Sequence, residues 1–420
     1  MSVGLNRRSL LGAGAGMLAL PHLGRASLSA PMFRRGVSIH NLLNWAEVEP
    51  NDKNTYRWPP FQSVHHQMQS ALYGNIVAAG FDFVRLTIDS GLFLQITGER
   101  RNVLDEILVK AIKTFQSHGL GVVVDFHGNS QVPAYAPLRI TESLSSPLFE
   151  AYSVMLVRTA KLLSVFKGTR IALELMNEPQ WGWDASSAAR WQTMQQLWHD
   201  RVRAANPDLT LVLTGARGGN AAGLMLIDAK PFAGSDVLWS FHYYEPYELT
   251  HQGVKFDSPK SRSWRYFSDL PYPAAPEHYE LIWPIIERNI KADSSLAADL
   301  RETLIGEARD SLKRYLDARP GRATVKRDFE AVTDWTKRFS IPTNRLFLGE
   351  FGITRTYGRY RASPPGPLSH WLFDVREEAE ARNIGWALWA LSGYGGMALV
   401  ETDESVSFDK PTIAALGLKG

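Results

Sequence analysis

The sequence predicts an α/β protein of the (β/α)8 barrel (TIM barrel) class. Eight short apolar runs rich in β-branched residues recur along the 420 residues, and longer segments with helical periodicity lie between them. Such alternation is typical of parallel sheets covered by helices. A doubly wound nucleotide-binding sheet is the alternative. It is less favoured because neither a Gly-x-Gly-x-x-Gly motif after an early strand nor a Gly-Lys-Ser/Thr loop occurs.

The predicted strands can be placed in chain order from runs such as Gly-Val-Val-Val-Asp-Phe-His at 121–127. They cover residues 35–40, 81–88, 121–127, 170–177, 210–214, 237–244, 345–350 and 384–391. Apolar residues recur at three- and four-residue intervals in the segments between them, which predicts helices over 103–117, 147–166, 185–205 and 370–382. We therefore expect one barrel domain over residues 31–420.

Residues 245–344 form an unusually long connection between the sixth and seventh predicted strands, which predicts an insertion at about 255–340. Residues 293–326 are charged and rich in Ala and Leu, so they favour a helix or a helical pair. The insertion is expected to pack on the barrel as a lid-like subdomain, with a wall that contacts a bound ligand as the alternative. Its first part is aromatic, with Trp264, Tyr266, Phe267, Tyr272, Tyr279 and Trp283.

Residues 1–30 contain Arg7-Arg8, then a weakly apolar run to Leu20 and small residues around 24–26. This arrangement resembles a twin-arginine export signal. A membrane anchor is the alternative, but an apolar run of about a dozen residues is shorter than the roughly 20 that span a bilayer. We expect a cleaved signal, no stable membrane span after its removal, and a periplasmic or extracellular protein.

Charge and cysteine content exclude several classes of protein. The formal net charge is +3, and residues 1–26 contribute three arginines and no acidic residue, so the remainder is neutral. A nucleic-acid partner is not expected, because no basic stripe is present to bind phosphates. The chain has no cysteine, which excludes disulfides and thiolate metal sites.

Functional side chains are expected where predicted strands end. The carboxyl ends of barrel strands converge on one mouth, so polar residues from different strands can surround one substrate there. A single glutamate at a strand end is usually a salt-bridge partner or a surface charge, whereas two such glutamates suggest chemistry. The candidates are Arg85, His127, Asn177, Glu178, His242, Tyr244, Glu350 and Trp389.

The two glutamates, Glu178 and Glu350, suit the cleavage of a glycosidic bond. That reaction needs a carboxylic acid to protonate the leaving oxygen and a carboxylate to meet the anomeric carbon. Carboxyl groups about 5–5.5 Å apart indicate a retaining mechanism, and groups roughly 6.5–9.5 Å apart indicate inversion. The sequence alone leaves this distance open.

Residues 171–179, Ile-Ala-Leu-Glu-Leu-Met-Asn-Glu-Pro, and 346–352, Leu-Phe-Leu-Gly-Glu-Phe-Gly, resemble the two catalytic signatures of glycoside hydrolase family five, the cellulase-like family. Residues 80–86 (Gly-Phe-Asp-Phe-Val-Arg-Leu) and the run from Phe-His-Tyr-Tyr-Glu-Pro at 241–246 to Thr-His-Gln-Gly at 250–253 add to the resemblance. The similarity extends over about residues 35–391. It implies a (β/α)8 fold and a retaining mechanism without metal or cofactor.

The resemblance also implies roles for the strand-end residues. Glu350 is expected to be the nucleophile, kept ionised by Arg85 and hydrogen-bonded by Tyr244. Glu178 is expected to be the general acid/base, with its pKa raised by burial and by the charge on Glu350.

The remaining candidates are implied to bind the sugar. Asn177 is expected to hold its 2-hydroxyl, and His127 and His242 to complete the polar ring. Trp389 is expected to lie beneath the sugar ring, with a role in barrel packing as its alternative. Trp386 is the better packing candidate, because residues three apart on a strand face opposite sides.

The predicted function is retaining hydrolysis of a β-linked polysaccharide or oligosaccharide, first as an endo-β-1,4-glucanase and alternatively as a β-mannanase or another β-glucanase. A metal-dependent hydrolase is less favoured because His127 and His242 lack paired ligand spacing. No Gly-x-Ser-x-Gly elbow suggests a serine esterase. A non-catalytic carbohydrate-binding barrel is the remote alternative. Loop tryptophans that could stack on sugars are Trp45, Trp181, Trp183 and Trp264.

Overall fold

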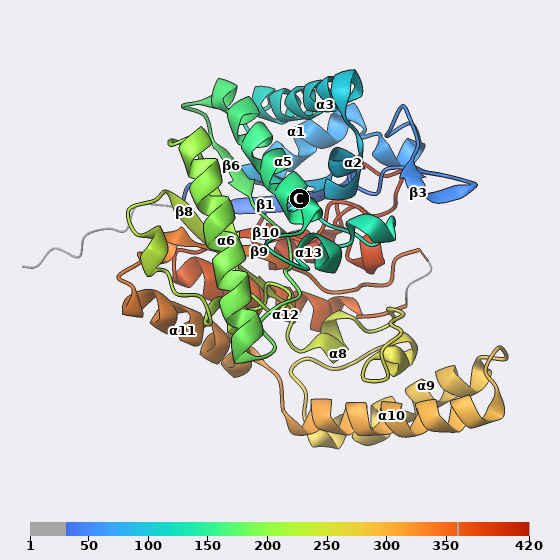
Figure 1. Cartoon of the computed structure of the whole chain (residues 1–420). Helices are drawn as coiled ribbons and strands as arrows, with labels where there is room; N and C mark the ends of the chain where they lie inside the picture. The colour runs from blue at the N-terminus through green and yellow to red at the C-terminus, as the bar shows by residue number, and fades with distance from the viewer. Residues whose placement is uncertain (1–30, 359–360, 420) are drawn as a thin grey trace, which may run out of the picture.

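The computed structural model describes residues 31–358 and 361–419, so the expected signal at 1–30 lies outside the described residues. Eight parallel strands close into a barrel in the order β1-β10-β9-β8-β7-β6-β5-β4, which confirms the predicted fold class (Figure 1). The strands are β1 (Arg35–Leu43), β4 (Phe83–Asp89), β5 (Gly121–His127), β6 (Ile171–Glu174), β7 (Thr210–Thr214), β8 (Val237–Tyr243), β9 (Leu346–Phe351) and β10 (Gly385–Leu388).

Two of these strands end three residues earlier than the sequence predicts. The β6 ladder stops at Glu174 rather than 177, although Leu175 N and Asn177 N still donate to carbonyls of the neighbouring strands β7 and β5. The β10 ladder stops at Leu388 rather than 391. In both cases the chain turns out of regular pairing just before the site, so residues beyond the strand end reach the mouth.

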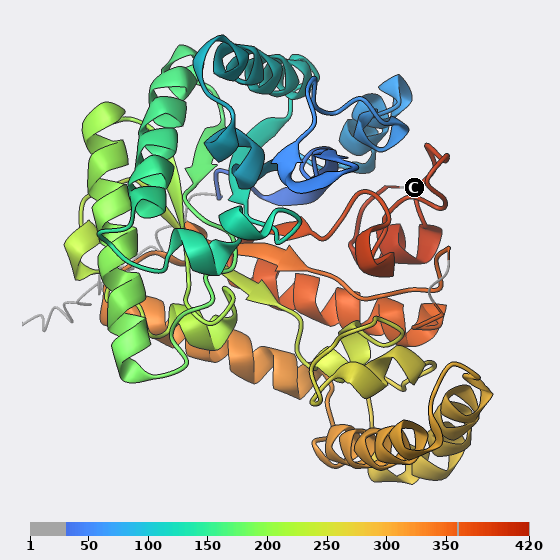
Figure 2. The same ribbon diagram turned by 45° about the vertical axis from the view of Figure 1, so that its right-hand side comes forward.

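Helices on the outside of the barrel cover the strands on all sides (Figure 2). Helix α6 begins where predicted because the Asp184 carboxylate accepts a hydrogen bond from Ser187 N at 2.9 Å. Helices α3 and α12 begin five residues earlier than predicted, since their first turns are mainly polar or proline-containing and add little to the apolar periodicity. The outer helices include α1 (Ser70–Ala79), α3 (Gly98–Ser117), α5 (Pro147–Leu163), α6 (Ala185–Ala205), α11 (Arg322–Arg338) and α12 (Pro365–Ala381).

The inside of the barrel changes from apolar to polar toward the mouth. Alternate residues of a strand point inward, so each strand contributes one side chain to each successive layer. The lower layer is an apolar cluster of Phe33, Phe83, Val123, Ala172, Val212, Leu238, Phe347 and Ala387. Two positions further along the strands lie the buried polar residues Arg85, Asp125, Glu174, Thr214 and Ser240.

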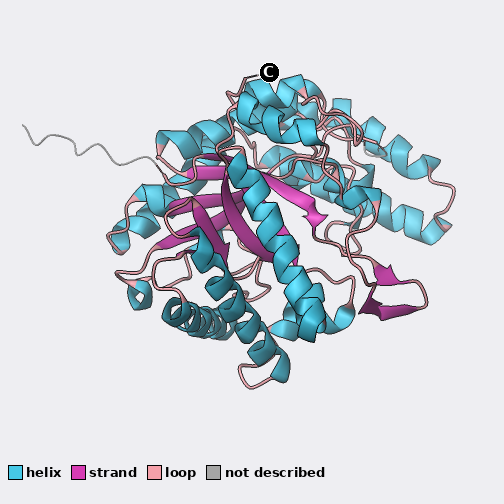
Figure 3. Ribbon diagram, turned by 90° about the horizontal axis from the view of Figure 1, so that it is seen from above, coloured by secondary structure: helices cyan, strands magenta, loops and turns pink. Residues whose placement is uncertain are grey.

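A short hairpin of β2 (Val48–Glu49) and β3 (Asp52–Tyr56) projects from the barrel (Figure 3). No sequence pattern predicts this hairpin, because its residues are mostly polar and exposed and show no apolar alternation. Tyr56 at its end is buried and donates to Asp89, which also caps α2 (Ser90–Gln95).

The long connection between β8 and β9 contains two parts. Helices α9 (Tyr279–Ala292) and α10 (Ala298–Asp317) pack on each other and stand beside the barrel (Figure 1). Trp264 contributes to this packing, because its indole donates to Ser311 Oγ in α10. Helix α11, in contrast, packs against α12 in the outer layer of the barrel.

None of the helices in residues 31–358 and 361–419 is both long enough and apolar enough to cross a bilayer.

Candidate active site

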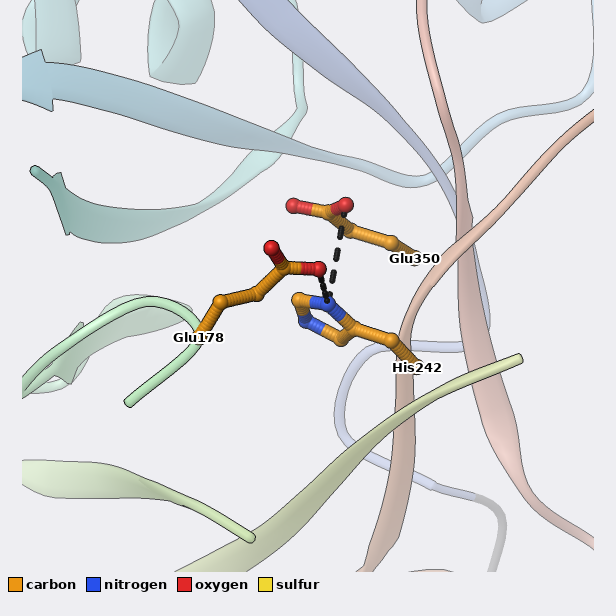
Figure 4. Close-up of side chains that lie close together, drawn as sticks. All are labelled: Glu178, His242 and Glu350. Atoms are coloured by element: carbon orange, nitrogen blue, oxygen red, sulfur yellow. Dashed lines mark hydrogen bonds and ion pairs between the residues drawn. The ribbon is translucent and has the colours of Figure 1, made fainter. Parts of the chain in front are cut away.

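Glu178 and Glu350 meet at the mouth of the barrel, with His242 between them (Figure 4). One carboxylate oxygen from each glutamate and one ring nitrogen of the histidine all lie within 4.8 Å of one another. Glu350 belongs to β9 and is buried, whereas the Glu178 side chain is 36% exposed. The two carboxylates are therefore close together but unequally exposed.

Glu178 lies beyond the end of β6, in a loop that turns sharply. Its φ of +35° falls in the left-handed region, which is uncommon for a residue with a side chain and costs roughly 1–3 kcal/mol. Its Oε1 lies 2.9 Å from His242 Nδ1. The fold therefore stabilises an unfavourable backbone conformation that directs this carboxyl group toward β8 and β9.

Glu350 has a hydrogen-bond donor at each of its oxygens. Arg85 Nη1 donates to Oε1 at 2.6 Å, and the Tyr244 hydroxyl donates to Oε2 at 2.9 Å. The neighbouring Gly349 allows this close approach of β9, because a Cβ there would lie 2.5 Å from Ser240 Oγ. Donors at both oxygens hold the Glu350 carboxyl group in one orientation.

Arg85 connects Glu350 to carboxylates deeper in the barrel. It is fully buried and binds Glu174 with two hydrogen bonds of 2.7 and 3.0 Å. Its Nη2 also lies 3.0 Å from Asp125 Oδ2 and donates to Asn177 Oδ1 at 2.8 Å. Burial alone favours the neutral form, but Asp125, Glu174 and Glu350 raise the pKa of Arg85 well above its usual value. The guanidinium is therefore a fixed positive charge.

His127 links this network to Trp389. Its Nδ1 lies 2.8 Å from Asp125 Oδ2, and its Nε2 lies 3.4 Å from Asn177 Nδ2. The His127 ring stacks on the Trp389 indole, with centroids 5.2 Å apart and planes at 15°. Trp386 faces the outside of the barrel, where it donates to Glu380 of α12. Trp386 therefore packs outside the barrel, whereas Trp389 lies against His127 at the mouth.

Burial sets the ionisation of the groups around the cleft. Desolvation raises the pKa of the Glu178 carboxyl, and the charge on Glu174 adds to this effect, while His127 and Arg85 oppose it. Desolvation lowers the pKa of His242 to about 4, against the opposing effect of Glu350. His242 is therefore neutral near neutral pH, and the Glu178 carboxyl retains a proton more readily than usual.

All eight candidates lie in one connected group. The contacts run from Glu178 through His242 to Glu350, then through Arg85 and Asn177 to His127 and Trp389, with Tyr244 bound to Glu350.

Three further residues of this group, Asp125, Glu174 and His40, were missed in the sequence analysis. Asp125 precedes His127 by two positions and so lies on the same side of β5, a signal that strand periodicity could have provided. Glu174 is the last residue of β6. His40 is buried in β1 and accepts a hydrogen bond from the Trp45 indole at 2.7 Å.

Glu178, His242 and Glu350 are also spaced closely enough to bind one cation. The donors around them argue against a dedicated metal site. Arg85 and Tyr244 already occupy the two oxygens of Glu350, and the Arg85 charge opposes a second positive charge nearby. The arrangement fits proton transfer and nucleophilic attack better.

A (β/α)8 barrel with two neighbouring glutamates at its mouth defines the class of barrel glycoside hydrolases. Residues 48–395 match the model of the cellulase family, glycosyl hydrolase family 5. The chain belongs to this family.

Curated relatives are distant and differ in length. The chain is 22% identical over 332 residues to endoglucanase 3 of Fibrobacter succinogenes, covering 75% of this chain and 44% of the relative. It is 24% identical over 175 residues to cellodextrinase A of Ruminococcus flavefaciens, covering 42% and 51%. The match to endoglucanase C of Acetivibrio thermocellus is 22% over 324 residues, covering 75% and 81%. The chain thus spans about half the length of the first two relatives.

Solved structures share the fold at low identity. Cellulose synthase subunit Z from Clostridioides difficile is 19% identical with a TM-score of 0.63, covering 91% of this chain and 99% of that chain. A family 5 xyloglucanase from Paenibacillus pabuli is 16% identical with a TM-score of 0.64, covering 92% and 98%. Thermotoga maritima Cel5A, solved with mannotriose, is 16% identical with a TM-score of 0.63, covering 92% and 97%.

Proposed function

We propose that this protein is a retaining, endo-acting β-glycanase whose first candidate substrate is β-1,4-glucan. The observation that carries the proposal is the position of Glu178 and Glu350, whose nearest carboxylate oxygens lie within 4.8 Å. This separation suits direct attack by one carboxylate on the anomeric carbon. An inverting enzyme needs a gap of roughly 6.5–9.5 Å to hold a water molecule.

In the first step, protonated Glu178 donates its proton to the glycosidic oxygen as the bond to the anomeric carbon breaks. A Glu350 oxygen forms a bond to that carbon and gives a covalent glycosyl-enzyme. Arg85 and Tyr244 hold the two oxygens of Glu350, which keeps the carboxylate oriented for attack.

In the second step, the Glu178 carboxylate takes a proton from water, and the water oxygen attacks the anomeric carbon. The bond to Glu350 breaks, and the product retains its anomeric configuration. His242 contacts Glu178 at 2.9 Å and is neutral, so it can orient this carboxyl group without fixing it in the ionised form.

The sugar at the cleavage point is proposed to lie against Asn177 and Trp389. The Asn177 carbonyl oxygen is occupied by Arg85, which leaves its amide nitrogen to donate to the 2-hydroxyl. Trp389 offers an apolar indole held in place by stacking on His127.

Stereochemistry and substrate range test the proposal. Proton NMR of the first products should show the β-anomer from a β-linked substrate, and an α-anomer would contradict the retaining mechanism. Release of reducing ends should be compared on soluble cellulose derivatives, mannan, xyloglucan and β-1,3-glucan. Higher activity on mannan or another glucan would assign a different substrate to the enzyme. No release of reducing ends from any polymer would favour a non-catalytic binding barrel.

We also propose that residues 1–30 direct export through the twin-arginine route to the periplasm or the extracellular space. The support is the Arg7-Arg8 pair followed by a weakly apolar run. Replacing both arginines by lysine should leave the protein in the cytoplasm, as measured by cell fractionation. Unchanged export of this variant would contradict the proposed route.

A further inference from the structure

We propose that Trp183 forms an outlying sugar subsite on the leaving-group side of the cleavage point, where it stacks on a β-linked polysaccharide chain. The inference rests on the proposed function and adds a binding residue to it. It predicts that the protein distinguishes polymers from short substrates through this side chain.

The four loop tryptophans considered as sugar contacts differ sharply in the structure. Three are partly buried and donate their indole N–H within the protein. Trp183 instead has 65% of its surface exposed. Tryptophan is on average a strongly buried residue, so this exposure requires an explanation. The three internal pairs are Trp45 with His40, Trp181 with Thr141, and Trp264 with Ser311.

The backbone on both sides of Trp183 is anchored. Arg217 Nε donates to the Gly182 carbonyl at 2.7 Å, and Gly182 N donates to Ser187 Oγ at 3.1 Å. On the other side, Asp184 caps helix α6. The indole therefore projects from a fixed loop, and little backbone freedom remains to be lost when a ligand binds.

The position of this loop identifies the side of the cleft. Trp183 follows Glu178 in the connection between β6 and α6, at the mouth of the barrel. The general acid must contact the leaving oxygen, so the leaving-group sugar lies next to Glu178. A longer chain continuing beyond that sugar can then reach the loop that carries Trp183.

A second exposed apolar side chain borders the same loop. Leu226, which is 42% exposed, has its Cδ1 3.5 Å from the position that a Cβ on Gly182 would take. Leu226 therefore adds a second exposed apolar side chain beside the loop that carries Trp183. The face of an aromatic ring carries a partial negative charge, and the carbon-bound hydrogens of a pyranose ring stack against it.

The test compares Trp183→Ala and Trp183→Tyr with wild type on a soluble β-glucan polymer and on an aryl cellobioside, which has no sugar on the leaving-group side. Trp183→Ala should raise KM for the polymer roughly three- to ten-fold and leave the aryl substrate unaffected. Trp183→Tyr should retain most of the polymer affinity. The matched control is Val165→Ala, which removes an apolar side chain 68% exposed at the opposite end of the barrel.

An unchanged KM of Trp183→Ala for the polymer would overturn the inference. Equal losses on both substrates would also overturn it, because they indicate a structural role. If wild type cleaves no polymer, the proposed function fails separately. Affinity electrophoresis in gels containing the polymer then tests the subsite: weaker retardation of Trp183→Ala supports it, and equal retardation overturns it.

Discussion

Arg85 Nη1 lies 2.6 Å from Glu350 Oε1, while the same guanidinium is fixed from below by two hydrogen bonds to Glu174. Nε and one N–H of Nη2 donate to Glu174, so Nη1 is directed at Glu350. The orientation of Glu350 at the mouth therefore depends on a carboxylate in the layer beneath it.

Replacing Glu350 with Ala should lower kcat by roughly a thousand-fold or more, because the covalent step loses its nucleophile. Azide fits the space left by the carboxylate and should partly restore activity on an activated aryl glycoside. The product should be a glycosyl azide of inverted configuration, identified by NMR. Activity near that of wild type without azide would contradict the assigned role.

Replacing Glu178 with Ala should abolish polymer cleavage but preserve the first step on substrates with good leaving groups, which need no proton. Wild-type kcat/KM should fall at high pH as Glu178 loses its proton. Burial raises the pKa of Glu178, so the apparent pKa of this alkaline limb of the pH profile should lie above the ordinary glutamate value of 4.5. In Glu178→Ala the same limb should disappear from the pH profile on an activated substrate, and its persistence would assign the limb to another group.

Replacing Glu174 with Gln should lower kcat about ten-fold or more with a smaller change in KM, because Arg85 is released from its orienting contact. The matched control is Glu380→Gln. Glu380 binds Arg35 outside the barrel with the same geometry, at 2.7 and 3.0 Å. This control should keep wild-type kcat. Equal losses of kcat in the two variants, or no loss in Glu174→Gln, would contradict a role of Glu174 in positioning Arg85.

Asp125 should make the stability of the protein depend on pH. Burial raises its pKa to about 7, although Arg85 opposes the shift. The folded state therefore binds a proton more tightly than the unfolded state, which stabilises the fold at acidic pH. This contribution, on the order of 2–4 kcal/mol, should be lost as pH rises from about 4 to 7.

Urea unfolding of wild type and Asp125→Asn between pH 5 and 8 measures the Asp125 contribution. The free energy of unfolding of wild type should fall relative to the variant as pH rises. Asp317→Asn, which changes an exposed carboxyl at the end of α10, should follow wild type. Parallel curves for wild type and Asp125→Asn would contradict the expected linkage.

Metal chelators should leave activity unchanged, because the proposed steps use only protein groups and water. Excess Zn²⁺ should inhibit, since Glu178, His242 and Glu350 offer three ligand atoms within 4.8 Å. His242→Gln should weaken this inhibition. Loss of activity after dialysis against a chelator, with recovery on adding a divalent cation, would contradict the metal-free mechanism.

The sequence by itself determined the barrel and the places where chemistry could occur. Eight apolar runs separated by helical segments allow few other folds, and Glu178 and Glu350 each follow such a run closely. These features are local, because strand and helix patterns depend on residues close together in the chain.

The tertiary structure alone decided which polar groups meet. The partners of Arg85 come from β5, β6 and β9, and no local pattern reveals that Glu174 and Asp125 share one guanidinium. The sequence also does not determine which tryptophans are exposed. Trp181 and Trp183 are two positions apart, yet the Trp181 indole donates to Thr141 and the Trp183 indole faces solvent. Distances across a closed barrel depend on the packing of all its strands together, which is why they appear only once the chain is folded.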